Sequence, residues 1–195
     1  AHFDKLSKRL HGDREAQCKA ELQAGRALFY KRDRDLAAKR LGPLATRCKD
    51  PEIKAWSRYY AGSARQCTGD PLGAITEYEA ATRTDPSFPQ AEARIALAYA
   101  LYLDWGWDFP DVPRDSQQMR GERAADRALV LDSLSADGWV ARGYLRSFRD
   151  PRAMDGVIPA LERATLLDPR NAEAWHQYGS FLSNAGRLEE AKAAM

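Results

Sequence analysis

The sequence has no run of about 18 apolar residues, the length that a membrane-spanning helix requires. It also lacks the apolar core of a signal peptide in its first residues. We therefore expect no membrane insertion by this segment. No methionine opens the chain, and the last copy of the pattern described below is cut short at Met195. We expect the natural protein to be longer.

Neither sign of charge is in excess, because 30 Lys and Arg residues face 28 Asp and Glu residues, for a net charge of +2. Nucleic-acid-binding proteins usually concentrate basic charge on one face or tail. The densest basic cluster, residues 31–34, contains an aspartate and lies where a turn is expected. No nucleic-acid partner is expected.

Residues that carry catalytic chemistry are scarce. The three histidines, His2, His11 and His176, have no partners at metal-ligand spacing. A glycine-rich phosphate loop, a nucleophile elbow and a His-Glu-x-x-His motif are all missing. Only a pair of carboxylates brought together by folding would escape this search. We predict that the chain is not an enzyme and that it needs no metal or cofactor.

What the sequence does contain is an internal repeat. Trp139 and Trp175 lie 36 residues apart, and each is followed four residues later by a glycine. These glycines, with their upstream counterparts and one alanine in the same place, form the series Gly25, Gly62, Ala98, Gly143 and Gly179. A second pattern of small and apolar residues at offsets of four and seven follows the first four members of the series, at residues 37–44, 74–81, 121–128 and 157–164.

Offsets of three and four place side chains on one face of a helix, so each copy is interpreted as two helices. A small residue on the first helix lets the second helix cross closely, with the alanine of the second pattern expected at the contact. The second helix should end before Pro86 and Pro169, because the residue before a proline avoids the helical conformation. Gly69 and Gly186 are expected in the turns between paired helices.

This pattern resembles the tetratricopeptide repeat family, most clearly at residues 171–191 and nearly as well at 55–86. The resemblance implies an all-α fold, a right-handed α-solenoid of antiparallel helix pairs, as a single array over residues 1–195. An unrelated helical bundle would not explain the shared phase of the glycines. We expect a helical cap at residues 1–14 and five repeats, near 18–51, 55–88, 91–133, 136–169 and, truncated, 172–195.

The third repeat carries an insertion at residues 104–114, whose prolines, glycine and aspartates predict a loop. The insertion contains Trp105, Trp107 and Phe109, which are costly to expose to water. Either these side chains fold back on a neighbouring repeat, or they present an aromatic surface to a ligand. A smaller insertion at residues 149–155 is expected to be only a longer turn.

The resemblance places a ligand on the concave wall formed by the first helices. Spacing from the packing glycine selects the inward-facing residues, which are rich in aromatic and hydroxyl groups. Packing between repeats is the alternative role for each tyrosine. The predicted groove residues are Arg26, Tyr59, Ser63, Tyr99, Tyr102, Tyr144, His176 and Ser180.

The implied function is a non-catalytic scaffold that binds a protein or peptide partner. One subclass of the family clamps a carboxylate with Lys and Asn, whereas the corresponding positions here hold Leu22, Arg26, Tyr60, Glu92 and Ala96. The alternative is a regulatory or sensory segment of a larger bacterial signalling protein, such as a Ser/Thr kinase or a transcription activator. A further hypothesis is a homo-oligomer formed through the uncapped C-terminal helix.

Two of the three cysteines lie at the ends of the first repeat. Cys18 opens its first helix and Cys48 closes its second, and antiparallel helices bring these ends together, which permits a disulfide. A disulfide would imply an oxidising, extracytoplasmic compartment. The alternative is that both are small buried residues, which leaves a cytoplasmic location open. Cys67 lies at the opposite end of its helix and is expected to be free.

Overall fold

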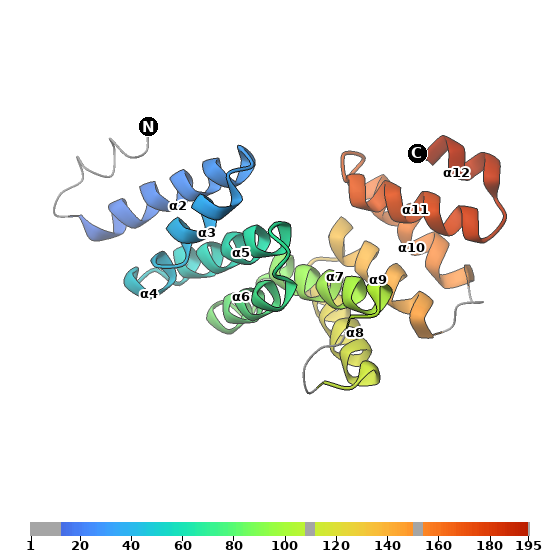
Figure 1. Ribbon diagram of the computed structural model, residues 1–195, viewed down its shortest axis with the longest axis horizontal. Helices are drawn as coiled ribbons and strands as arrows, with labels where there is room; N and C mark the ends of the chain where they lie inside the picture. Colours follow the sequence, from blue (N-terminus) through green and yellow to red (C-terminus); the bar gives the residue numbers. More distant parts are fainter. Residues whose placement is uncertain (1–12, 108–111, 150–153, 195) are drawn as a thin grey trace. The chain divides into compact units, whose positions relative to one another are not determined.

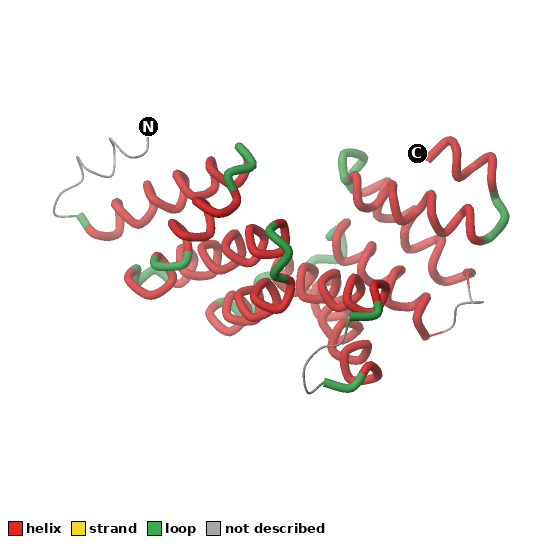
Figure 2. The backbone as a smooth tube through the Cα atoms, viewed as in Figure 1, coloured by secondary structure: helices red, strands yellow, loops and turns green. Residues whose placement is uncertain are grey.

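Helices joined by turns make up the computed structural model, which describes residues 13–107, 112–149 and 154–194. Figure 2 shows these helices in red and the turns between them in green, with no strand among the described residues. The cap predicted at residues 1–14 lies outside this part of the chain, except for its last two residues. The chain divides into two compact units, Ala1–Ala91 and Glu92–Met195. A single array through both units stays a prediction.

In the first unit, α2 packs against α3, α3 against α5, and α5 against α6 (Figure 1). Short turns join α2 to α3 and α5 to α6, which makes each pair antiparallel. The helices are α2 (Arg14–Tyr30), α3 (Arg34–Leu41), α4 (Leu44–Arg47), α5 (Pro51–Cys67) and α6 (Pro71–Thr84).

In the second unit, consecutive helices from α8 to α12 pack against one another in chain order. Asp137, on α9, accepts hydrogen bonds or ion pairs from two neighbouring repeats, through Arg94 at 2.9 Å and the side-chain amide of Asn171 at 2.8 Å. The helices are α7 (Pro89–Trp105), α8 (Arg114–Leu131), α9 (Ala136–Arg149), α10 (Met154–Leu167), α11 (Ala172–Asn184) and α12 (Leu188–Ala194).

The ends of the helices follow the local sequence. α6 ends at Thr84 and α10 at Leu167, each just before an Asp-Pro pair, as predicted. Gly69 and Gly186 have φ values of 81° and 76° in the predicted turns, and Arg32 takes the same left-handed conformation, at 66°, in the first repeat. The basic cluster at residues 31–34 therefore includes a turn, as expected.

The second helix of the first repeat is broken, which the sequence pattern did not predict. α3 ends at Leu41 and a separate turn of helix, α4, begins at Leu44, with Gly42 and Pro43 between them. Pro43 has no N–H to donate to the preceding turn of helix, and its ring clashes with that turn. The pattern at residues 37–44 therefore spans two short helices instead of one.

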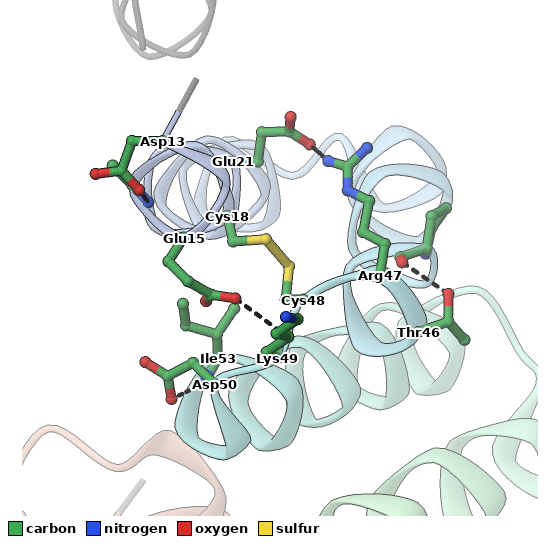
Figure 3. Close-up of a disulfide and its surroundings, with 12 residues drawn as sticks. Asp13, Glu15, Cys18, Glu21, Thr46, Arg47, Cys48, Lys49, Asp50 and Ile53 are labelled. Atoms are coloured by element: carbon green, nitrogen blue, oxygen red, sulfur yellow. Dashed lines mark hydrogen bonds and ion pairs between the residues drawn. A yellow bond between two sulfur atoms is a disulfide. The ribbon is translucent and has the colours of Figure 1, made fainter. Parts of the chain in front are cut away.

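A disulfide closes this interrupted repeat. Cys18 on α2 is bonded to Cys48, which follows α4, and the two Cα atoms are 6.0 Å apart (Figure 3). Beside it, the Glu15 carboxylate accepts a hydrogen bond from the Lys49 N–H at 2.9 Å, and Glu21 pairs with Arg47. A crosslink that closes a loop of this length stabilises a fold by about 3–4 kcal/mol in the chain-entropy model. Cys67 is free and exposed.

Close crossing of paired helices depends on the repeated glycine. A methyl group at Gly62 would lie 2.8 Å from the ring of Tyr78 and 3.1 Å from the Ala74 carbonyl oxygen. Gly25 faces Leu41 and Gly143 faces Leu161 in the same way. In each case a large side chain of the second helix fills the space beside the glycine. It belongs to the residue four positions after the start of the second pattern, which is Leu41, Tyr78 or Leu161. The expected alanine takes part in the contact of the second repeat through the Ala74 carbonyl oxygen, while the ring of Tyr78 lies closer to the glycine.

The third repeat reverses this arrangement. Ala98 stands at the place of the glycine on α7, and the glycine is instead Gly121 on α8. A methyl group at Gly121 would lie 3.0 Å from the Tyr99 Cβ and 2.9 Å from Leu145. A small residue is therefore still present where these helices meet, but on the other partner.

We predict that Gly62→Ala lowers the free energy of unfolding by about 1–3 kcal/mol, because the added methyl overlaps the completely buried ring of Tyr78. Gly42→Ala is the control, since a methyl there would lie 3.4 Å from its nearest neighbour, the Ala38 carbonyl oxygen. Urea unfolding of both variants measures the difference. Equal stabilities for the two variants would contradict the close-crossing account.

Candidate functional site

Four of the eight predicted groove residues are buried. Tyr99, Tyr102, Tyr144 and Ser63 expose between 1% and 8% of their surface. They do not lie open to a ligand, and for them the prediction of direct ligand contact is corrected. The physical reason is that spacing identifies one face of a helix but not the neighbouring elements that cover it.

Each buried residue has a packing role. Ser63 donates a hydrogen bond to the Tyr59 carbonyl oxygen at 3.0 Å, and its hydroxyl accepts one from Tyr78 at 3.1 Å. Tyr99 lies against Gly121 on α8. Tyr102 packs edge-on against Trp107, with ring centroids 5.6 Å apart.

Tyr144 is held inside the second unit. Its ring packs edge-on against Phe181, with centroids 6.0 Å apart. Burial raises the pKa of the Tyr144 phenol, and the nearby Asp104 carboxylate raises it further, while Gln177 acts in the opposite direction. This environment favours the protonated hydroxyl and suits a structural residue.

The four remaining groove residues are accessible. Arg26 and Tyr59 are half-buried in the first unit. In the second unit, His176 is exposed and Ser180 is half-buried, both on α11. Arg26 and Tyr59 are therefore accessible in the first unit, and His176 and Ser180 in the second.

Arg26 and Tyr59 belong to an aromatic face on the first helices of two successive repeats, α2 and α5. Tyr30 is 67% exposed, and its hydroxyl lies 3.3 Å from that of Tyr60. Trp56 stacks on Tyr60 at 5.7 Å between ring centroids. We define the aromatic face by its members, Arg26, Phe29, Tyr30, Trp56, Tyr59 and Tyr60.

Two arginines lie over rings of this face, Arg34 at 3.9 Å from the centroid of Phe29 and Arg26 over the two rings of α5. The Arg26 guanidinium lies 5.2 Å from the centroid of Tyr60 and 5.8 Å from that of Trp56. Such contacts attract the cation to the faces of the rings. Burial, and then the hydrogen bond with Tyr30, raise the pKa of the Tyr60 phenol, which favours its protonated form.

Spacing from the packing glycine did not find Tyr30 or Trp56. Trp56 lies four residues before Tyr60, one turn of helix away, so a search for aromatic residues at helical spacing would have found this pair. Tyr30 is the last residue of α2, and its position beside Tyr60 depends on how α2 packs on α5. That contact cannot be derived from spacing alone.

The loop in the third repeat begins later than predicted, because α7 continues to Trp105. Trp105 and Trp107 are 55% and 43% exposed and pack edge-on, with ring centroids 4.6 Å apart. Arg114 donates a hydrogen bond to the Leu103 carbonyl oxygen at 2.6 Å, which ties the start of α8 to the end of α7. Phe109, like most of the smaller insertion at residues 149–155, lies outside the described residues.

A cavity of about 520 Å³ lies between α8 and α9 in the second unit. Its walls carry three arginines and two carboxylates, a combination that sequence patterns did not reveal because it joins residues from two repeats. The lining residues are Glu122, Ala125, Asp126, Arg142, Leu145, Arg146 and Arg149.

Comparisons with known proteins bear on the fold. Residues 160–193 match the sequence model described as tetratricopeptide repeat. A thermophilic tetratricopeptide repeat protein of Thermus thermophilus is similar in structure, with a TM-score of 0.73, 17% identity, and coverage of 91% of this chain and 87% of that chain. The fold is that of the tetratricopeptide repeat family. No curated protein sequence matches the chain.

Two other structures with the tetratricopeptide repeat fold have ligands or binding sites in their descriptions. YrrB, described as having an unusual peptide-binding site, has a TM-score of 0.59 at 14% identity and covers 100% of this chain and 89% of its own. The first such domain of Spaghetti (RPAP3), bound to an HSP90 peptide, has a TM-score of 0.52 at 20% identity, with coverage of 70% and 96%. At these identities the likeness confirms the predicted all-α class of paired helices and does not extend to ligands.

None of the helices that the structure describes is both long and apolar enough to cross a membrane. Within residues 13–107, 112–149 and 154–194, there is also no group of three or more His, Cys, Asp or Glu residues placed to hold a metal ion.

We predict that Tyr144→Phe changes how stability depends on pH. A phenol whose pKa is raised by folding contributes stability that is fully present below the unfolded value of about 10 and is lost as pH rises towards the folded value. The stability difference between the original chain and Tyr144→Phe should thus shrink as pH rises from about 10 to about 12. Urea unfolding across this range measures it, and a constant difference would contradict the buried, neutral role of Tyr144.

Proposed function

We propose that the chain is a non-catalytic scaffold that binds a peptide segment of a partner protein on the aromatic face of its first unit. The observation that carries the proposal is the contiguous set of accessible aromatic side chains on α2 and α5, capped by a cation. Tyrosine, tryptophan and arginine are the residue types most enriched where protein interfaces derive their binding energy.

The fold gives independent support. Repeats of this type are in general binding scaffolds without catalytic activity, and two solved structures of the same fold are described with a bound peptide or a peptide-binding site. This is an analogy at the level of the fold. The carboxylate-clamping mode is disfavoured, because Leu22, Tyr60 and Ala96 at the corresponding positions are buried apolar or aromatic residues.

The aromatic face suits an extended peptide. Tyr30 and Arg26 lie at the rim and offer a hydroxyl group and guanidinium N–H donors to backbone carbonyl groups. Phe29, Trp56 and Tyr59 are half-buried and offer ring surface between them. Their rings are already packed against one another, so little side-chain entropy is lost when a ligand binds.

A peptide library screened against the whole chain tests the proposal. We expect selected peptides to lose about tenfold in affinity with Arg26→Gln or Tyr30→Ser, equivalent to about 1.4 kcal/mol. Arg83→Gln, an equal charge change at a side chain that is 66% exposed on α6, is the control. Circular dichroism verifies that each variant folds. Selected peptides that bind all three variants as tightly as the unchanged chain would refute the aromatic face as the site.

A second candidate function is that of a regulatory or sensory segment of a larger bacterial signalling protein, located outside the cytoplasm. The observation that favours this location is the disulfide between Cys18 and Cys48, since such bonds persist mainly in oxidising compartments. Self-association through α12 remains a separate hypothesis, to be tested by sedimentation at several concentrations, where a monomer throughout would exclude it.

The location can be tested by trapping thiols in intact cells of the source organism with a membrane-permeant alkylating agent. We expect Cys67 alone to be labelled, and reduction of the purified chain to raise its mass by about 2 Da, one hydrogen for each sulfur. Reduction should also lower the free energy of unfolding by about 3–4 kcal/mol. Labelling of Cys18 and Cys48 in cells would contradict an oxidising location.

A further inference from the structure

The cavity between α8 and α9 contains an incomplete set of ion pairs. Arg142 pairs with Asp126 at 2.7 Å, and Arg149 pairs with Glu122. Arg146 lies on the same wall between these two arginines, and it forms no ion pair with any carboxylate of the described residues. The cavity therefore has three guanidinium groups for two carboxylates, which leaves one positive charge.

The position of Arg146 depends on a glycine of the next helix. A methyl group at Gly156, on α10, would lie 2.5 Å from the central carbon of the Arg146 guanidinium. The guanidinium therefore rests directly on the backbone of α10, and any side chain at this position would displace it. The absence of a side chain at Gly156 leaves room for the Arg146 guanidinium against α10. Glycine is unfavourable inside a helix, and most other residues of α10 have a stronger helix propensity.

Ala125 and Leu145 lie at the base of the cavity and are almost completely buried, at 1% and 0% exposure. The groups that the cavity offers to a ligand are therefore its charged side chains, among which Arg146 is exposed. A carboxylate is the expected ligand of Arg146, because the neighbouring Arg142 and Arg149 already pair with carboxylates of this chain.

We propose that this cavity is a second binding site, which takes an acidic side chain, Asp or Glu, from a peptide segment of a partner protein. The ligand carboxylate would pair with the exposed guanidinium of Arg146. The arginines at positions 142, 146 and 149 span about 10 Å along the helix at 1.5 Å per residue. That length matches about three residues of an extended peptide, so neighbouring acidic side chains can exchange with Asp126 and Glu122.

This site lies in the second unit and shares no residue with the aromatic face. Its success or failure is therefore independent of the proposed function. Tyr30→Ser, which tests the aromatic face, should leave binding at this cavity unchanged.

The test uses the whole chain and a peptide in which glutamates flank a leucine, labelled with an uncharged fluorophore and blocked at both termini so that only side-chain carboxylates are offered. Fluorescence anisotropy measures the affinity, and the NMR signals of the arginine Nε–H groups report where the peptide binds. We expect saturable binding that perturbs the Arg146 signal. Arg146→Gln should weaken binding about five- to tenfold, as expected for loss of one charge-assisted pair.

Two further variants separate a specific site from general attraction. Arg163→Gln, on the exposed side of α10, removes the same charge and should leave the affinity unchanged. Gly156→Ala keeps the charge and should weaken binding, while its melting temperature stays the same or rises because alanine favours the helix and the arginine end can swing away.

Several results would overturn the proposal. Equal binding of a peptide with glutamine in place of glutamate would show that charge is not recognised. An equal loss in Arg163→Gln and Arg146→Gln would show attraction by net charge alone. Perturbation of Arg146 by inorganic phosphate, with no response to the peptide, would assign the cavity to small anions and would exclude the acidic peptide.

Discussion

Helices in this protein pair closely because one partner carries a glycine where the other places a large side chain. Gly62 against Tyr78, and Gly143 against Leu161, show the arrangement on the first helix of a pair, and Gly121 shows it on the second. Each contact fixes the rotation of both helices about their axes, because only one face of each can approach so closely. The aromatic face and the cavity both depend on this rotation, since each is built from side chains of two neighbouring helices.

Much of the fold could be predicted from the sequence, because glycine, proline and aspartate act locally. The Asp-Pro pairs at residues 85–86 and 168–169 follow the ends of α6 and α10, and the glycines at positions 69 and 186 adopt the left-handed conformation that their turns require. The break in the second helix of the first repeat was not predicted, although the sequence has a proline there, because the repeat pattern continues across Pro43. The disulfide was left open, since spacing permits a bond between Cys18 and Cys48 without requiring it.

Candidate site residues were harder to predict, because accessibility depends on neighbours from other repeats. Tyr99 and Tyr144 occupy the expected helix face, yet they are buried, with Gly121 and Phe181 packed against them. Arg26 and Tyr59 are accessible and join a cluster whose other members, Tyr30 and Trp56, come from the packing of α2 on α5. Similarly, the missing carboxylate partner of Arg146 becomes apparent only when α8 is placed against α9. Sequence patterns specify the helices, whereas contacts between repeats determine which side chains remain available.

The measurement that tests the central claim most directly is NMR mapping of a selected peptide on the whole chain labelled with ¹⁵N. If the aromatic face is the main binding surface, amide shifts will concentrate in Arg14–Tyr30 and Pro51–Cys67, with the indole N–H of Trp56 among the most affected. The α6 amides, on the second helix of the same repeat, will move less. Shifts centred on α6, or spread evenly over the chain, would contradict the account.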